Sequence, residues 1–262
     1  MQANNITNIL TQAVKPSRFF VMLKKIAKRF LDRPGQHSRE ANLKWLESQC
    51  SDIGAFAASL DADLWNEALE SSARLEQQAA EILENIEFDL GGGGAYPFLY
   101  FVTRYMKPDC IVETGVAAGF SSSAFLSAIK KNGSGKLYSS DFPYFRISNP
   151  ESYVGIVVHQ SLRDDWRLYL SGDETNIPLI VKEAKHVDIF HYDSDKSYSG
   201  REFAISEISP FLTERAVIIM DDIQDNSYFL DYIDHYNPHS WRVFKFHNKY
   251  VGIIGKPTSR SC

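Results

Sequence analysis

The segment from Cys110 to Phe125 constrains the fold most strongly, because it combines a short apolar run, a glycine turn and a row of serines. The apolar run is β-branched and follows turn-forming residues, which favours a buried strand ending at Glu113. Gly115 and Gly119 bracket the next loop, and glycine accepts a positive φ and leaves space beside the backbone. Ser121 begins a serine run that supplies hydroxyls and free N–H groups for a helix start. The segment therefore predicts a loop that cradles a cofactor.

Strand-like and helix-like segments alternate after this loop. The alternation predicts right-handed crossovers and a parallel sheet covered by helices on both faces. The last two strands are joined by a short turn at 247–249, so the last strand should be antiparallel. We therefore expect an α/β fold with a doubly wound, mostly parallel, seven-stranded Rossmann-like sheet and an antiparallel last strand. The expected strands are 111–113, 136–140, 166–170, 187–192, 216–220, 241–246 and 250–254, and the expected intervening helices are 121–131, 175–184, 200–212 and 225–235.

The region before this domain has helical periodicity. Residues 39–60 and 64–88 each carry apolar residues at helical spacing, and four glycines at 91–94 cannot continue a helix. The glycine run is either a plain linker or a backbone that a ligand approaches closely. Residues 1–90 are therefore predicted to be an N-terminal helical cap, and residues 91–262 the cofactor-binding domain.

A basic amphipathic helix is expected at residues 17–31. Phe19, Leu23, Ile26 and Phe30 share one helical face, and lysines and an arginine occupy the other. Such a helix packs on the main domain or on a second subunit, attaches to an anionic membrane surface, or belongs to an organelle transit peptide. The sequence does not decide between these interpretations. Assembly into a homo-oligomer and a peripheral membrane contact through residues 17–31 are therefore both left open.

Charge and cysteine content narrow the function classes. Seven basic residues and one acidic residue give positions 1–33 a net charge of +6, and since the whole chain carries −5, the remainder carries −11. An acidic main domain argues against a nucleic-acid partner, because phosphate binding needs a basic surface. Three distant cysteines form neither a disulfide framework nor a Cys-x-x-Cys metal site, which favours the cytoplasm. No run of 18 apolar residues occurs.

The glycine spacing separates this loop from two common nucleotide motifs. An NAD fingerprint needs Gly-x-Gly-x-x-Gly, whereas this loop has only Gly115 and Gly119 with three residues between them. The run 133–136 lacks the first glycine of a phosphate-binding P-loop and is followed by leucine. Both NAD and nucleoside triphosphates are therefore disfavoured.

The pattern from Glu113 to Gly119 instead resembles the first motif of class I S-adenosylmethionine-dependent methyltransferases, in which an acidic residue precedes two glycines at this spacing. The resemblance narrows to small-molecule O-methyltransferases such as the catechol and macrolide-sugar enzymes, and it covers about residues 90–255. It implies that Asp141, ending the second strand, binds the ribose hydroxyls, since a carboxylate offers two acceptor oxygens to a diol. It further implies that Gly172, Asp173 and Glu174 lie in the loop that contacts adenine. With Glu113, Gly115, Gly119 and Ser121, these residues form the predicted S-adenosylmethionine site.

Two adjacent strand ends are unusually acidic. Asp193 follows the fourth strand, and Asp221 and Asp222 follow the fifth, so their side chains should meet at one edge of the sheet. Like charges held together favour a bound cation or a proton, and Mg²⁺ prefers oxygen ligands. The metal-dependent members of the resembled family hold their metal at the matching positions. The other reading makes Asp193 and Asp221 caps of the following helices, and Asp195 or Asp222 a surface ion-pair partner of Lys196 or Arg201.

The resemblance also supplies a candidate base. Lys196 lies three residues after Asp193, where the catechol enzyme has a lysine that acts as general base, and Asp193 and Lys196 are therefore the predicted catalytic residues. The histidine usual in macrolide-sugar enzymes is missing here, and His159, His191 and His247 are alternatives. The expected function is Mg²⁺-assisted methyl transfer from S-adenosylmethionine to a small hydroxylated acceptor, a sugar or natural product. The alternatives are a cephalosporin-hydroxylase-like enzyme and a non-catalytic, membrane-associated S-adenosylmethionine-binding protein.

Overall fold

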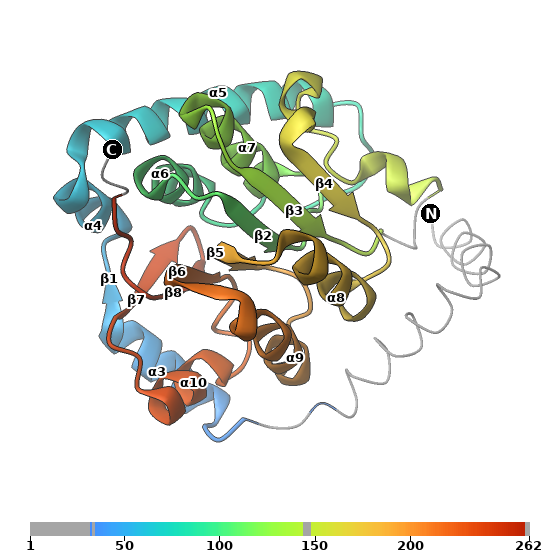
Figure 1. The fold of residues 1–262 in the computed structure, drawn as a ribbon. Coiled ribbons are helices and arrows are strands. Elements are labelled where there is room, and N and C mark those ends of the chain that lie inside the picture. The colour runs from blue at the N-terminus through green and yellow to red at the C-terminus, as the bar shows by residue number, and fades with distance from the viewer. Residues whose placement is uncertain (1–31, 33–34, 144–147, 260–262) are drawn as a thin grey trace.

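The chain was analysed as a computed structural model, which describes residues 32, 35–143 and 148–259. One sheet of eight strands runs through the molecule in the order β1-β7-β8-β6-β5-β2-β3-β4 (Figure 1). Its strands are β1 (Cys50–Ser51), β2 (Cys110–Thr114), β3 (Lys136–Ser140), β4 (Trp166–Tyr169), β5 (Val187–Tyr192), β6 (Leu212–Met220), β7 (Trp241–Phe246) and β8 (Lys249–Ile254). All neighbours pair in parallel except β8, which is antiparallel to both β6 and β7. The predicted α/β fold with an antiparallel last strand is confirmed.

The predicted strand number was one too low. β1 pairs with β7, Cys50 opposite Val243 and Ser51 opposite Phe244, and it interrupts what the periodicity predicted as a single helix over 39–60. Two residues are too few for an alternating pattern, so the sequence carries no strand signal there. Asp52 then caps a new helix by accepting a hydrogen bond from the Ala55 backbone N–H.

Helices cover both faces of the sheet (Figure 1). α4, α5, α6 and α7 pack on one face, and α3, α8, α9 and α10 on the other. Successive residues of a strand point to opposite faces of the sheet, so Ile111 belongs to the hydrophobic cluster on the first face and Val112 to the cluster on the second. The helices are α3 (Arg39–Gln49), α4 (Ile53–Leu60), α5 (Ala62–Leu83), α6 (Tyr96–Met106), α7 (Phe120–Asn132), α8 (Asp173–Ala184), α9 (Tyr198–Ile208) and α10 (Tyr228–Tyr236), with 3₁₀ turns at Pro150–Tyr153, Gln160–Asp165 and Ser209–Phe211.

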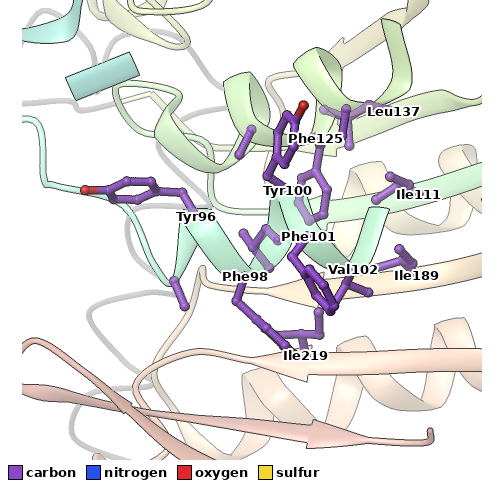
Figure 2. Packing of buried hydrophobic residues seen from close by; sticks show 14 of the residues in the cluster. Tyr96, Phe98, Tyr100, Phe101, Val102, Ile111, Phe125, Leu137, Ile189 and Ile219 are labelled. Atoms are coloured by element: carbon purple, nitrogen blue, oxygen red, sulfur yellow. The ribbon is translucent and has the colours of Figure 1, made fainter. Parts of the chain in front are cut away.

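The helix α6 lies in the centre of the first face. Phe98, Phe101 and Val102 are fully buried, and Figure 2 shows them directed toward the sheet residues Ile111, Ile189 and Ile219. Residues on all sides of the helix are buried, which is expected when a helix lies between a sheet and further helices. α6 is therefore fixed rigidly, and the glycine run at 91–94 that precedes it is held at the edge of the sheet.

The helices of the predicted cap share this core. The Phe56 ring of α4 lies 6.2 Å from the Phe98 ring and 5.2 Å from the Phe244 ring of β7. The predicted division at residue 90 stays a prediction, and the predicted helix 17–31 lies outside the described residues. No helix in the described part of the chain is long and apolar enough to cross a membrane.

Candidate functional site

The glycine loop between β2 and α7 has the predicted strand-turn-helix form. Gly115 and Gly119 have φ values of +82° and +101°, in the region that only glycine occupies without strain. The Gly115 backbone N–H donates to the Ser140 carbonyl of β3 at 2.8 Å. A Cβ at Gly115 would lie 2.3 Å from the Asp193 carbonyl oxygen, so glycine is required by contact with the next loop as well as by φ. The loop thus lies directly against the segment that follows β5.

Glu113 lies beneath this loop. Its carboxylate is fully buried, and Oε2 accepts hydrogen bonds from the Ser122 hydroxyl at 2.6 Å and the Ser139 hydroxyl at 2.8 Å. The side chain therefore links β2 to α7 and β3, which fixes the loop from below. Ser121 is also buried, in the first turn of α7. Cofactor contacts of Glu113 and Ser121 stay predictions.

Asp141 lies beside the loop itself. One carboxylate oxygen accepts hydrogen bonds from the Val116 and Ala117 backbone N–H groups at 3.1 and 2.8 Å, and the other accepts from the Phe142 N–H at 2.6 Å. Burial raises the pKa of Asp141, and these three donors oppose the rise. The carboxylate is therefore held in a fixed orientation at the carboxyl end of β3.

The predicted adenine loop meets Asp141 at the same edge. The Gly172 N–H donates to the Asp141 carbonyl at 3.1 Å, and Asp173 accepts from the Ser140 hydroxyl at 2.6 Å. Gly172 has a φ of +84° and precedes α8, whose first turn contains Asp173 and Glu174. The structure thus brings Gly115, Asp141 and 172–174 together, although their contacts with a cofactor stay predictions.

Three carboxylates converge where β5 and β6 end. Asp193, Asp221 and Asp222 offer ligand atoms that all lie within 4.8 Å of one another. Adjacent parallel strands explain the convergence, since the Asp193 N–H donates to the Thr114 carbonyl of β2 and the Asp221 N–H to the Tyr192 carbonyl of β5. The predicted meeting of these side chains is confirmed.

Two lysines reach the cluster. Lys196 Nζ contacts an oxygen of Asp193 and lies 2.8 Å from Asp222 Oδ2. Lys249, at the start of β8, lies 3.3 Å from the same Asp222 oxygen and 3.8 Å from Asp221 Oδ2. Burial lowers the pKa of Lys196, but the two aspartates more than reverse this, so its pKa is raised and the side chain is an ammonium near neutral pH. The base role of Lys196 stays a prediction, and these carboxylates act against it.

Asp221 differs from its two neighbours. Its side chain is buried, and neither carboxylate oxygen has a hydrogen-bond partner among the residues that the structure describes. Burial, together with the charges of Asp193 and Asp222, raises the pKa of Asp221 to about 6. A buried carboxylate without donors is costly to ionise, which is the arrangement expected of an oxygen ligand for a cation.

Three supporting residues escaped the sequence analysis. A Cβ at Gly94 would lie 2.7 Å from Asp221 Oδ2, so the glycine run passes directly over the cluster. Arg201 is buried in α9 and donates to the backbone carbonyls of Asp221 and Asp222 at 3.1 and 2.9 Å. Lys249 reaches the cluster from the β7-β8 turn. Only the glycine run gave a signal, because four glycines admit close approach.

The alternative histidines lie in different environments. His159 is exposed and caps the 3₁₀ turn at Gln160–Asp165, and His247 is exposed in the β7-β8 turn. His191 is buried on β5, where Nδ1 lies 3.8 Å from Glu113 Oε1 and the ring packs on Phe125. The two exposed histidines are not among the residues that contact the acidic cluster, and a base role for any of the three stays a prediction.

Comparison with known proteins agrees with this geometry. Residues 112–223, from β2 to the loop after β6, match the sequence model of a methyltransferase domain family. This part of the chain is therefore similar to a methyltransferase domain. The match confirms the resemblance to class I S-adenosylmethionine-dependent methyltransferases that the glycine spacing indicated, and with it the prediction of a methyltransferase. No match was found among the curated proteins.

Solved structures with the same fold include several methyltransferases. The SAH-bound methyltransferase PaMTH1 of Podospora anserina superposes with a TM-score of 0.53 at 13% identity, covering 70% of this chain and 87% of that one. A putative caffeoyl-CoA O-methyltransferase of Staphylococcus aureus gives 0.52 at 13% identity, with 69% and 91% covered. The O-methyltransferase TomG of Streptomyces achromogenes, in complex with SAM, gives 0.51 at 13% identity, with 70% and 89% covered. These likenesses establish the fold of the methyltransferase domain.

Proposed function

We propose that this chain transfers a methyl group from S-adenosylmethionine to a hydroxyl oxygen of a small molecule, with a divalent cation such as Mg²⁺ held by Asp193, Asp221 and Asp222. The observation that carries the proposal is the convergence of these carboxylates within 4.8 Å of one another, next to the Gly115 loop. O-methyltransferases among the solved structures of the same fold support the choice of oxygen as acceptor.

The cluster fits a hard cation. Its donor set is entirely carboxylate oxygen, which Mg²⁺ prefers, and the two Asp221 oxygens are buried without donors. Arg201 fixes the backbone of both Asp221 and Asp222, so their side chains leave a rigid strand end. The opposing feature is the pair of lysines, Lys196 and Lys249, whose ammonium groups both contact Asp222 Oδ2 and would compete with a cation there.

Two groups of residues at the carboxyl ends of the strands, the glycine loop with Asp141 and the acidic cluster with Lys196, would have separate roles in the reaction. When bound, S-adenosylmethionine supplies a methyl group on a sulfonium, and a divalent cation supplies positive charge that lowers the pKa of an acceptor hydroxyl. The loop from Gly115 to Gly119 would hold the cofactor beside Asp141, whose carboxylate would offer oxygens to the ribose diol. Lys196 lies where it can orient the acceptor hydroxyl or, once its pKa is lowered, take its proton.

Calorimetric titration tests the cofactor and the cation separately. S-adenosylhomocysteine is titrated into the protein with Mg²⁺ and with EDTA, and methyl transfer to catechol and sugar acceptors is followed as S-adenosylhomocysteine release. We expect Asp193→Asn to abolish transfer and to leave cofactor binding intact. Asp195→Asn is the matched control, because Asp195 Oδ1 accepts from the Ser197 N–H, a contact that asparagine retains.

Each result bears on a different part of the proposal. Absence of cofactor binding with or without Mg²⁺ would refute the methyltransferase function of this chain. Cofactor binding with transfer that is unaffected by EDTA would refute the cation alone. Normal transfer by Asp193→Asn would contradict the role of the acidic cluster in either case.

A further inference from the structure

A groove runs between α9 and α10, on the face of the sheet opposite α6. Its volume is about 880 Å³. One wall consists of α9 residues at helical spacing, including Ser199, Glu202 and Phe203, and the other of α10 residues, including Tyr228, Tyr232 and Tyr236. The groove therefore runs along both helices and combines aromatic rings with a carboxylate.

The path of the N-terminal chain leads to this groove. Asp32 accepts hydrogen bonds from the Tyr198 and Ser199 backbone N–H groups, at 2.7 and 3.1 Å, and so caps the first turn of α9. The Gln36 N–H donates to Asp231 Oδ2 at 2.7 Å, and His37 Nδ1 lies 2.6 Å from Asp231 Oδ1 on α10. The chain is thus attached to both walls, through Asp32 at α9 and through Gln36 and His37 at α10.

The close packing at Gly35 shows that this attachment is specific. A Cβ on Gly35 would lie 1.8 Å from the Ser227 hydroxyl oxygen and 3.0 Å from both Asp231 Oδ2 and the Tyr198 ring. The chain therefore packs tightly between α9 and α10, where any larger residue would displace the side chains of Ser227, Asp231 and Tyr198. The segment that precedes Asp32 is therefore connected to the chain at a point next to both helices.

The chemistry of the preceding sequence complements the groove. Residues 17–31 carry an apolar face of Phe19, Leu23, Ile26 and Phe30 and an opposite face rich in lysine, and they contain no acidic residue. Among the described residues, the groove lining contains Glu202 and Asp231 and no lysine or arginine. The tyrosine rings offer an apolar surface, and Tyr236 is 64% exposed.

The predicted helix of residues 17–31 is also long enough to span the groove. As an α-helix, residues 17–31 would measure about 22 Å, and α9 with its 11 residues measures about 16 Å at 1.5 Å per residue. A helix laid along the groove would cover its length. A lining with two carboxylates is a poor surface for an anionic membrane, so the groove favours the basic segment of the chain itself.

We propose that residues 17–31 form an amphipathic helix that docks in the α9-α10 groove of the same chain, with its apolar face on the tyrosines and its lysines near Glu202. This interaction is independent of the proposed methyl transfer. The docked helix would cover α9. That helix carries Arg201, which donates to the backbone carbonyls of Asp221 and Asp222.

Hydrogen exchange of the full-length protein, read by mass spectrometry on peptides that cover 17–31, tests the docking. We expect these peptides to be protected in the wild type. Glu202→Lys and Tyr236→Ser should each speed their exchange by about threefold or more, since exposed contacts of this kind are worth up to about 1 kcal/mol each. The matched controls are Glu207→Lys on α9 and Leu179→Ser on α8, both outside the groove lining, and they should leave the exchange unchanged.

A second measurement on the wild type does not depend on any variant folding. Carbodiimide joins a lysine to a carboxylate only in direct contact, so a crosslink from Lys24, Lys25 or Lys28 to Glu202 within the monomer supports the docking. Unprotected 17–31 peptides without this crosslink overturn it, as does protection that the groove variants and their controls alter equally. Protection that is lost on dilution would assign the groove to a second copy of the chain. Protection that needs anionic vesicles would assign residues 17–31 to a membrane surface. Either result would overturn docking within one chain.

Discussion

Replacing Asp221 by asparagine is expected to stabilise the metal-free protein and, in the same step, to remove its affinity for a divalent cation. The carboxylate is buried, its oxygens have no donors, and its pKa is raised from 3.8 to about 6. A raised carboxyl pKa means that the folded protein disfavours the ionised form relative to the unfolded chain. Asparagine has nearly the same shape and carries no charge, so it removes that penalty.

The size of the effect follows from the shift. One pKa unit corresponds to about 1.4 kcal/mol, so the shift of about two units costs the wild type about 3 kcal/mol at pH 8, where Asp221 is ionised in both states. The penalty declines as the pH falls through 6, because the folded state then binds the proton, and it disappears below 3.8. At pH 5 about half of it should remain.

Urea unfolding of both proteins in EDTA, at pH 8 and pH 5, measures this difference. We expect Asp221→Asn to exceed the wild type in free energy of unfolding by about 3 kcal/mol at pH 8 and by about half as much at pH 5. Asp222→Asn is the matched control: burial alone would raise its pKa, but Lys196 and Lys249 more than reverse this, so its ionised form is favoured and the substitution should destabilise. A destabilised Asp221→Asn, or a difference that does not change with pH, would refute the reasoning.

Three further predictions concern the support of the site. Gly115→Ala should destabilise the protein by more than about 1–2 kcal/mol, because alanine resists a φ of +82° and its Cβ would in addition lie 2.3 Å from the Asp193 carbonyl oxygen. It should also weaken S-adenosylhomocysteine binding in calorimetry, and an unchanged affinity would contradict the place of this loop in the cofactor site. Arg201→Met should lower the free energy of unfolding by about 3–5 kcal/mol in urea, since two buried carbonyls lose their donors, and Arg201→Lys should fall between it and the wild type. Lys249→Met should tighten Mg²⁺ binding about two- to fivefold, since it removes a half-exposed ammonium that competes with the cation. The surface variant Lys256→Met is the control, and equal Mg²⁺ affinities of the two variants would contradict that competition.

Much of the fold could be predicted from local pattern. Each of the seven longer strands has four residues or more and contains β-branched or aromatic residues, and the glycine loop after β2 is specified by the positions of Gly115 and Gly119. The acidic cluster could also be predicted, because parallel strands place their carboxyl ends at one edge and Asp193 and Asp221 directly follow two such strands. These features depend on residues close in sequence or on a topological rule.

The missed features depend on contacts between distant segments. β1 is a strand only because β7 lies beside it, and two residues cannot signal a sheet by themselves. Gly94 meets Asp221 because α6 is held in the first core, and Lys249 arrives with the β7-β8 turn. Arg201 reads as an exposed helix residue in the sequence and is instead buried beneath Asp221 and Asp222.

The lysines make the predicted cation and the predicted base dependent on each other. Asp222 Oδ2 lies 2.8 Å from Lys196 Nζ and 3.3 Å from Lys249 Nζ, so a cation at that oxygen competes with both ammonium groups, whereas the donor-free oxygens of Asp221 remain open to it. The charges that raise the pKa of Lys196 are the same carboxylates that a cation would neutralise. Lys196 is therefore expected to be a charge partner of the cluster in the metal-free protein, and a base role becomes accessible to it only when those carboxylates are engaged elsewhere.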